Sequence, residues 1–344
     1  MKVLVVGGAG YIGSHCCKAL SQAGHEPIVF DNLSTGRREF VRWGEFYQGD
    51  ILDKAALDEV MAMHAPDVVM HFAALAIVPE SVAEPQDYYT NNVTGTLNVL
   101  QAMRKFGLDS IVFSSTCAVY GEPATMPIDE KIECRPVNPY GTTKLICERM
   151  MDDFDDAYGL KSFRLRYFNA AGADPDAEIG EDRDAETHLI PLVLDALGGR
   201  RDGISIFGDD YPTPDGTAVR DYIHVTDIAN AHIMALEYLL EHRQTAAANL
   251  GTGQGTSVSE VMAAAEQRTG IGLTKTVKPR RPGDPPTLVA DPGKANTLLR
   301  WKAQSSDIST IVDDAWRWHQ RRFQDSQLQE TICSDGDKLA SESQ

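Results

Sequence analysis

The sequence predicts an α/β protein, with a Rossmann-type doubly wound parallel sheet and a smaller C-terminal mixed α/β lobe that binds substrate. Three observations support this fold class. Strand-like and helix-like segments alternate through the first half of the 344 residues, a glycine-rich turn follows the first strand-like run, and long polar loops begin near Gly172. Alternation of this kind is typical of a parallel sheet covered by helices. A chain of this length also favours about two domains.

The elements of the first half are expected in alternating order. Short apolar runs predict strands, and stretches with helical periodicity predict the helices between them. The expected strands are residues 2–6, 27–30, 46–47, 68–72, 110–113 and 162–168. The expected helices include residues 11–23, 88–106 and 140–158. We assign residues 1–170 to a dinucleotide-binding domain, to which later segments could return.

Residues 171–324 are expected to form the substrate-binding lobe. Two long polar stretches rich in Asp, Gly and Pro occupy residues 171–187 and 208–217, and loops of such length are usually functional or disordered. Helical patterns resume near residues 225–241, 258–268 and 308–322. The last stretch, 325–344, is polar and aperiodic, which predicts a disordered tail.

Charge and hydropathy limit the partners. The formal net charge of −18 argues against a duplex-DNA partner, although local arginines could still bind a small anion. No run approaches the roughly 18 to 20 apolar residues that span a bilayer, so no membrane partner is expected. The apolar run at the N-terminus breaks at Gly7, which argues against a signal peptide.

Cysteine and histidine spacing point to a reducing compartment and no metal. The six cysteines show neither C-x-x-C spacing nor the density of a disulfide framework, so we expect reduced thiols and a cytoplasmic protein. The histidines show no H-x-x-H or H-E-x-x-H spacing, and no metal site is expected.

A glycine-rich turn predicts a dinucleotide site. Gly7, Gly10 and Gly13 follow the first predicted strand and open a helix, and with Gly8 the turn also satisfies G-x-G-x-x-G. Such glycines permit a tight turn and let backbone N–H groups reach a pyrophosphate. Asp31 ends the next predicted strand, where a carboxylate binds the ribose hydroxyls and repels a 2′-phosphate. The pattern therefore favours NAD over NADP.

Tyr140 and Lys144 lie four residues apart in a predicted helix, so they share one face. Thr116 ends a strand about 25 residues earlier, and ligands of doubly wound sheets bind at the carboxyl ends of strands. We expect all three near a nicotinamide. A Tyr base active at neutral pH needs its pKa lowered by about 3 units from ~10, roughly 4 kcal/mol. One cation at ~4 Å supplies about that at an effective dielectric of ~20, so we expect Lys144, helped by the positive nicotinamide ring, to lower the pKa of Tyr140.

Several motifs together resemble the UDP-glucose 4-epimerase family of the extended short-chain dehydrogenase/reductase superfamily. The resemblance covers roughly residues 1–322, and its most specific block is residues 208–232. The motifs are the turn of residues 7–13, "SST" at 114–116, "YGTTK" at 140–144, "YFN" at 167–169, "HLIP" at 188–191, "NLGTG" from 249 and "RRPGD" at 280–284.

The resemblance implies an isomerase that interconverts UDP-galactose and UDP-glucose. In such a reaction the C4 hydride of the sugar passes to a tightly held NAD. The resulting 4-keto sugar turns about its diphosphate linkage and regains the hydride on its other face. Tyr140 would be the base, Lys144 would lower its pKa and hold the nicotinamide ribose, and Thr116 would bridge Tyr140 to the sugar hydroxyl. The family also implies a homodimer, formed through helices like those at 88–106 and 140–158.

The resemblance also assigns binding residues. Those expected to bind NAD are Gly7, Gly10, Tyr11, Ile12, Gly13, Asp31, Asn32, Asp50, Ile51, Phe72, Ala73, Ala74, Asn92, Ser114, Tyr140, Lys144 and Tyr167. Those expected to bind the UDP-sugar are Thr116, Tyr140, Asn169, His188, Leu189, Phe207, Arg220, Tyr222, Arg281, Asp284 and Leu288. Arg220 and Arg281 would bind the diphosphate, because a guanidinium can engage two oxygens at once.

Other functions remain open at the level of sequence. Leu288 occupies the position of the family's substrate-size gate, where a small residue admits N-acetylated sugars and a bulky aromatic excludes them, so related UDP-sugars stay possible substrates. A nucleotide-sugar dehydratase would carry Asp-Glu after the strand-end Thr, whereas here Cys117 and Ala118 follow Thr116. A non-catalytic NAD sensor would be expected to lack Tyr140 or Lys144.

Overall fold

The computed structural model describes residues 1–281 and 284–323, and its centre is a seven-stranded parallel sheet. The predicted tail at 325–344 lies outside the described residues. The strands run in the order β11 (Ala246–Leu250), β6 (Lys161–Tyr167), β5 (Ser110–Thr116), β4 (Val68–His71), β1 (Lys2–Val6), β2 (Glu26–Asp31) and β3 (Glu45–Gln48). The predicted Rossmann-type α/β fold is therefore confirmed.

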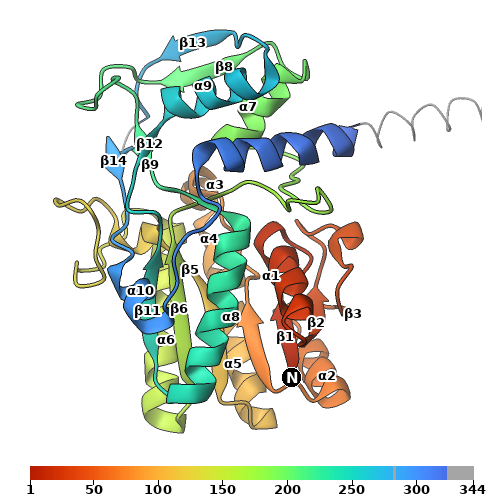
Figure 1. Cartoon of the computed structure of the whole chain (residues 1–344). Coiled ribbons are helices and arrows are strands. Elements are labelled where there is room, and N and C mark those ends of the chain that lie inside the picture. The colour runs from red at the N-terminus through yellow and green to blue at the C-terminus, as the bar shows by residue number, and fades with distance from the viewer. Residues whose placement is uncertain (282–283, 324–344) are drawn as a thin grey trace, which may run out of the picture.

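Apolar side chains that alternate along the strands bury both faces of this sheet. Val3 and Val5 of β1 pack with α1 (Tyr11–Gln22) and α8 (Val225–His242) on one face. Leu4 and Val6 pack on the other face, whose helices are α2 (Lys54–His64), α5 (Gly95–Phe106) and α6 (Pro139–Tyr158). Figure 1 shows these helices on the two sides of the sheet. Burial of both faces explains why the strands read as continuous apolar runs.

Most predicted elements of this domain match the structure within one or two residues, but the predicted helix at 88–106 is interrupted. It consists of the end of α4 (Pro85–Tyr88), a π-helical segment η2 (Tyr89–Thr94) and α5. The short α3 (Val78–Ala83) precedes them. The predicted strand at 110–113 extends to Thr116, which brings that residue to the carboxyl edge of the sheet.

The C-terminal lobe lies over this carboxyl edge (Figure 1). Its core is formed by α7 (Leu189–Leu197), β8 (Ile204–Phe207), α9 (Val258–Thr269) and the helix at residues 308–323. Three short sheets complete the lobe. They pair β13 (Lys275–Lys278) with β8, β10 (Tyr222–His224) with β7 (Asn169–Ala171), and β9 (Val219–Arg220) with β12 (Thr256–Ser257) and β14 (Thr287–Leu288).

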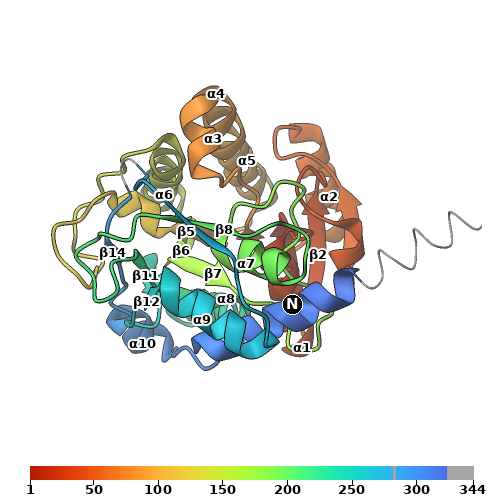
Figure 2. The same ribbon diagram turned by 90° about the horizontal axis from the view of Figure 1, so that it is seen from above.

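The chain crosses between the two parts more than once. After β10, the chain returns to the seven-stranded sheet. Helices α8 and α10 (Gly293–Leu299) pack on one face of this sheet, and β11 joins it as an edge strand beside β6. Figure 2, a view from above, shows α7 and α9 of the lobe over the strands. The domain boundaries at 170 and 324 stay a prediction. Among the described residues, no helix combines the length and apolarity that a bilayer crossing needs.

Candidate active site

The glycine turn between β1 and α1 has no room for side chains at two of its positions. A Cβ on Gly7, whose φ is +84°, would lie 2.4 Å from the backbone nitrogen of Ala73, and a Cβ on Gly13 would lie 2.2 Å from the carbonyl oxygen of Gly7. Helix α1 then begins at Tyr11, with Gly10 as an N-cap that offers no side-chain acceptor and no acidic residue in the first turn. Helix N-termini of this kind bind phosphate through backbone N–H groups.

Asp31 ends β2 beside this turn, as predicted. Its carboxylate accepts hydrogen bonds from the backbone N–H groups of Ala9 (2.9 Å) and Leu33 (2.8 Å). Burial raises the pKa of Asp31, and these two bonds act in the opposite direction. Next to it, the Asn32 amide donates to the Asp50 carboxylate at 2.8 Å. The cradle and the carboxylate at the adjacent strand end fit a dinucleotide with a free ribose 2′-hydroxyl.

The remaining predicted cofactor residues differ in whether their side chains are free to contact a cofactor. Phe72 and Ala73 follow β4, and both their N–H groups donate to the carbonyl oxygen of Val6, which places them beside the glycine turn. Asn92 lies in η2 and is buried, with its amide donating to Leu75 O (3.0 Å) and to Thr143 Oγ1 (3.1 Å). Its side chain therefore links protein segments. The others lie on or beside the carboxyl ends of β1, β3, β4, β5 and β6: Tyr11, Ile12, Ile51, Ala74, Ser114 and Tyr167.

Tyr140 lies in the first turn of α6. Asn138 caps this helix, accepting from the Gly141 N–H at 2.8 Å, and Pro139 occupies the first position, where its missing N–H costs nothing. Burial raises the pKa of Tyr140 to about 12, while a hydrogen bond with the Thr116 side chain opposes that shift. Thr116 ends β5, so the structure brings the predicted base and the predicted bridging hydroxyl together.

Lys144 is buried and points toward the end of β5. Its Nζ donates to the carbonyl oxygen of Ser114 at 2.9 Å and lies 4.7 Å from the centre of the Phe113 ring. Burial lowers the pKa of Lys144 to about 8, and Cys147 and the negative charge of Glu148 oppose that shift. In the polypeptide itself, burial dominates the pKa of Tyr140 and the Lys144 ammonium is directed at Ser114. The lowering of the Tyr140 pKa by Lys144 together with a positive nicotinamide ring stays a prediction.

Two pairs among the predicted substrate residues lie in contact. The Arg220 guanidinium forms an ion pair with Asp284, and the strand pairing of β9 with β14 sets Leu288 beside Arg220. The Arg281 guanidinium lies 4.0 Å from the centre of the Phe207 ring, a cation–π distance. Each of these contacts joins residues that are far apart in the chain.

Other predicted site residues lie in short strands, at a strand end or at the start of α7. Asn169 of β7 pairs in register with Tyr222 of β10. Tyr167, two residues earlier, is in hydrogen-bonding contact with the Ser114 hydroxyl at the end of β5. Leu189 begins α7, and His188 precedes it as the N-cap residue.

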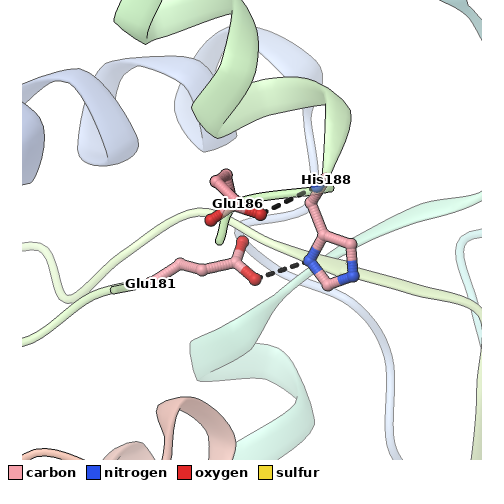
Figure 3. A group of neighbouring side chains, drawn as sticks. All are labelled: Glu181, Glu186 and His188. Carbon is pink, nitrogen blue, oxygen red and sulfur yellow. Dashed lines mark hydrogen bonds and ion pairs between the residues drawn. The ribbon is translucent and has the colours of Figure 1, made fainter. Parts of the chain in front are cut away.

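His188 belongs to a charged cluster that the sequence did not predict (Figure 3). Its Nδ1 contacts Glu181 Oε1 at 2.5 Å, its backbone N–H donates to Glu186 at 2.8 Å, and Arg183 Nε lies 3.1 Å from Glu181 Oε1. The charge of Glu181 raises the pKa of His188 despite burial. Arg183 also acts electrostatically on Tyr140 and lowers its pKa. The only sequence signal for this cluster was the length of the polar loop at 171–187.

In the part of the chain that the structure describes, two groups have donor atoms that could surround a metal ion, and the cluster includes one of them: Glu181, Glu186 and His188. Here Glu181 already has two cationic or donor partners, Arg183 and His188. The second group, Asp174, Asp176 and Glu178, surrounds the Lys18 ammonium at 2.7, 3.2 and 2.8 Å. Both groups therefore serve as ion-pair partners for basic side chains.

Comparisons with known proteins agree with this geometry. The NAD dependent epimerase/dehydratase family matches residues 3–251. The chain is 52% identical to the UDP-glucose 4-epimerase of Rhizobium meliloti over 322 residues, 94% of this chain and 98% of that protein. It is 50% identical to the UDP-glucose 4-epimerase of Lacticaseibacillus casei over 321 residues, 93% and 97% of the two chains.

A solved structure extends the agreement to three dimensions. The crystal structure of UDP-glucose 4-epimerase from Brucella ovis in complex with NAD has a TM-score of 0.90 and 52% identity, covering 92% of this chain and 97% of that one. The matched residues include the glycine turn, the ends of β4 and β5, and Tyr140 with Lys144. The chain therefore belongs to the NAD dependent epimerase/dehydratase family.

Proposed function

We propose that the protein is a UDP-glucose 4-epimerase, which interconverts UDP-galactose and UDP-glucose with a tightly bound NAD. The observation that carries this proposal is the 52% identity to such an epimerase over 94% of the chain. The contact of Tyr140 with Thr116 at the carboxyl end of β5 supports it independently.

The N-terminal domain would hold the cofactor. Backbone N–H groups at the start of α1 would bind the pyrophosphate, Asp31 would bind the adenosine ribose, and Lys144 would hold the nicotinamide ribose. When bound, NAD supplies the acceptor and donor for the hydride at C4 of the sugar. Because NAD would return to its oxidised form at the end of each turnover, it would not need to exchange, and one tightly bound NAD would serve many turnovers.

Tyr140 would exchange the proton of the sugar 4-hydroxyl. The Thr116 side chain lies near the phenol, whose pKa it lowers, and would bridge it to that hydroxyl. A phenol whose pKa is raised to about 12 is a weak acid, so the base needs positive charge beside it. The cations available are Arg183, which acts on Tyr140 across the site, and Lys144, which lies one turn along α6.

The lobe would hold the UDP moiety. Arg220 and Arg281 would bind the diphosphate, Asn169 would add a polar contact, and Asp284 would bind the uridine ribose. The ion pair between Arg220 and Asp284 supports their assignment to one small site. Phe207 would line the uracil pocket, and its ring already stacks against Arg281.

Substrate choice would depend on Leu288. It is partly buried in β14, next in register to Arg220, so its side chain lies near the predicted diphosphate ligands. Leu is intermediate in size, and related UDP-sugars, including N-acetylated ones, UDP-xylose and UDP-glucuronate, are alternative substrates of the same site.

We also propose a cytoplasmic homodimer. The helices expected at the dimer interface, η2 with α5 and α6, carry the exposed rings of Tyr89 and Tyr158. The five described cysteines are free thiols, which supports a reducing compartment. Light scattering coupled to gel filtration tests the dimer, and a monomeric mass would refute it.

The experiment that tests the function is incubation of the purified protein with a panel of UDP-sugars and no added NAD. We expect UDP-galactose and UDP-glucose to reach the same equilibrium mixture from either side. Absence of conversion in a sample that contains one equivalent of bound NAD would refute the proposal.

A further inference from the structure

A buried carboxylate lies one helical turn beyond Lys144 and joins α6 to β5 and β6. Glu148 Oε1 accepts hydrogen bonds from Ser115 Oγ at 2.5 Å and from Arg166 Nε at 2.9 Å, and its Oε2 contacts Arg166 Nη2. The exposed fractions of Glu148, Ser115 and Arg166 are 2%, 1% and 8%.

The position of Ser115 connects this pair to the chemistry. Its neighbours in β5 are Ser114, whose carbonyl oxygen accepts from Lys144, and Thr116, whose side chain lowers the pKa of Tyr140. Because side chains alternate along a strand, Ser115 faces away from the side chains of Ser114 and Thr116. Glu148 thus binds β5 at the residue between these two, on the opposite face of the strand.

Glu148 is the carboxylate that acts electrostatically on Lys144, one turn earlier in α6. His71 of β4 and Cys147 of α6 also act on Lys144, and Arg164 and Arg166 of β6 act on Glu148. Tyr140 lies one turn before Lys144, and Tyr167 of β6 contacts Ser114. Burial lowers the pKa of His71 to about 3 and raises those of Cys147, Tyr140 and Tyr167, so these four are neutral near pH 7.

Glu148 itself stays ionised. Burial alone would raise the pKa of its carboxyl, but the hydrogen bonds and positive charge of Arg166, with Ser115 and Arg164, hold that pKa below its usual value. A buried ion pair is a weak source of stability, because its desolvation penalty offsets most of its attraction. A role in the neighbouring site explains its position better than stability does.

We propose that Glu148 is a positioning residue of the reaction, which acts in two ways. Through Ser115 and Arg166 it holds the end of β5 against α6, and through its negative charge it keeps Lys144 an ammonium beside the cofactor. The inference rests on the proposed function, because it concerns how that site keeps its charge. Glu148 touches neither the base nor the predicted substrate residues.

The test is the pH dependence of kcat/KM and of NAD retention in the variant Glu148→Gln. This variant removes the negative charge, keeps a similar shape and leaves an amide oxygen that can still accept from Ser115 or Arg166. An opposite charge nearby shifts a pKa by about 1 to 3 units, so loss of Glu148 moves the alkaline limb of kcat/KM down by about one pH unit. The NAD that survives gel filtration at pH 9 falls in parallel.

The matched control is Ser115→Ala, which removes a hydrogen bond and keeps every charge. It is expected to lower the rate equally at all pH values, with the alkaline limb in place. If Glu148→Gln behaves like this control, Glu148 is only structural and the charge role is refuted. If Glu148→Gln does not fold, as judged by circular dichroism, Glu148→Gln/Arg166→Gln is measured under the same criterion, with a smaller downward shift expected because the positive charge of Arg166 is removed as well.

NAD retention separates failure of this inference from failure of the proposed function. Retained NAD is quantified after denaturation and requires no turnover. A wild-type protein that holds NAD but converts no UDP-galactose would refute the function, whereas retention at pH 9 that is equal in wild type and Glu148→Gln would refute the role of Glu148.

Discussion

The Lys144 ammonium donates a hydrogen bond of 2.9 Å to the carbonyl oxygen of Ser114, near the end of strand β5. Tyr140 lies one turn earlier on the same helix, and the side chain of Thr116, two residues further along that strand, lowers the pKa of its phenol. Both side chains of the Tyr-x-x-x-Lys pattern therefore lie beside the last three residues of β5. This attachment places the phenol and the ammonium at the carboxyl edge of the sheet, where the glycine turn also lies.

Replacing Tyr140 by Phe removes the hydroxyl and leaves the ring in place. We expect turnover of UDP-galactose to fall by at least a hundredfold, given general-base contributions of ~10² to 10⁴, with NAD still bound. Steady-state kinetics and the NAD content of the denatured protein provide the two readouts. Near-normal turnover in this variant would remove Tyr140 from the mechanism.

The pKa of Tyr140 predicts a proton release when oxidised NAD binds. In the polypeptide this pKa is about 12, so the phenol is protonated at pH 8. A positive nicotinamide ring nearby lowers the pKa, so binding favours the phenolate, and NAD affinity rises with pH between the lowered value and about 12. Calorimetry of protein stripped of nucleotide, in two buffers with different ionisation enthalpies, measures the release. The same release from Tyr140→Phe would contradict this assignment.

Two neighbouring arginines provide a test of diphosphate binding. Arg281 stacks on Phe207, whereas Arg280 pairs with exposed Asp210 and lies over Tyr211. We expect Arg281→Ala to raise KM for UDP-galactose about tenfold or more, since a hydrogen bond to a charged group contributes ~1.5–3 kcal/mol. Arg280→Ala is the control and is expected to leave KM within about twofold. Equal effects of the two changes would argue against a specific ligand role for Arg281.

Leu288 is the expected gate for sugar size. We expect Leu288→Tyr to suppress any activity on UDP-N-acetylglucosamine more than activity on UDP-galactose, because the larger ring fills space beside Arg220. The ratio of kcat/KM for the two substrates is the measurement. If both activities fell by the same factor, Leu288 would not be the gate.

The Rossmann half of the fold was predictable because its signals are local. Continuous apolar runs marked the buried strands, and the glycine turn marked the start of α1. Helices α5 and α6 end at Gly107 and Gly159, both left-handed, so their ends carried a local signal as well. The π-helical segment η2 was missed, because it continues the same side-chain periodicity with one wider turn.

The substrate lobe was less predictable because contacts between distant residues build it. Strands β9 and β14 have two residues each, too few for a periodicity, yet their pairing sets Leu288 beside Arg220. The ion pairs of Arg37 with Asp182 and Asp184 join segments about 145 residues apart. Such pairs depend on the path of the whole chain, and motif resemblance alone suggested residues for this site.

The direction of the Lys144 side chain also could not be read from the sequence. Four-residue spacing places Tyr140 and Lys144 on one helix face, but the spacing does not say what each polar end contacts. The backbone carbonyl of Ser114 is a nearby acceptor for a buried ammonium, and that contact sets the direction. The charge cluster of Glu181, Arg183 and His188 arises in the same way, from a loop that folds back over the site.

The most direct test of the mechanism uses UDP-galactose that carries deuterium at C4 of the sugar, in ordinary water. Transfer of this hydrogen to a bound nicotinamide and back predicts UDP-glucose that retains the deuterium at C4, as read by NMR and mass spectrometry. Loss of the label to solvent, at a rate matching product formation, would show that C4 is deprotonated instead and would contradict the account.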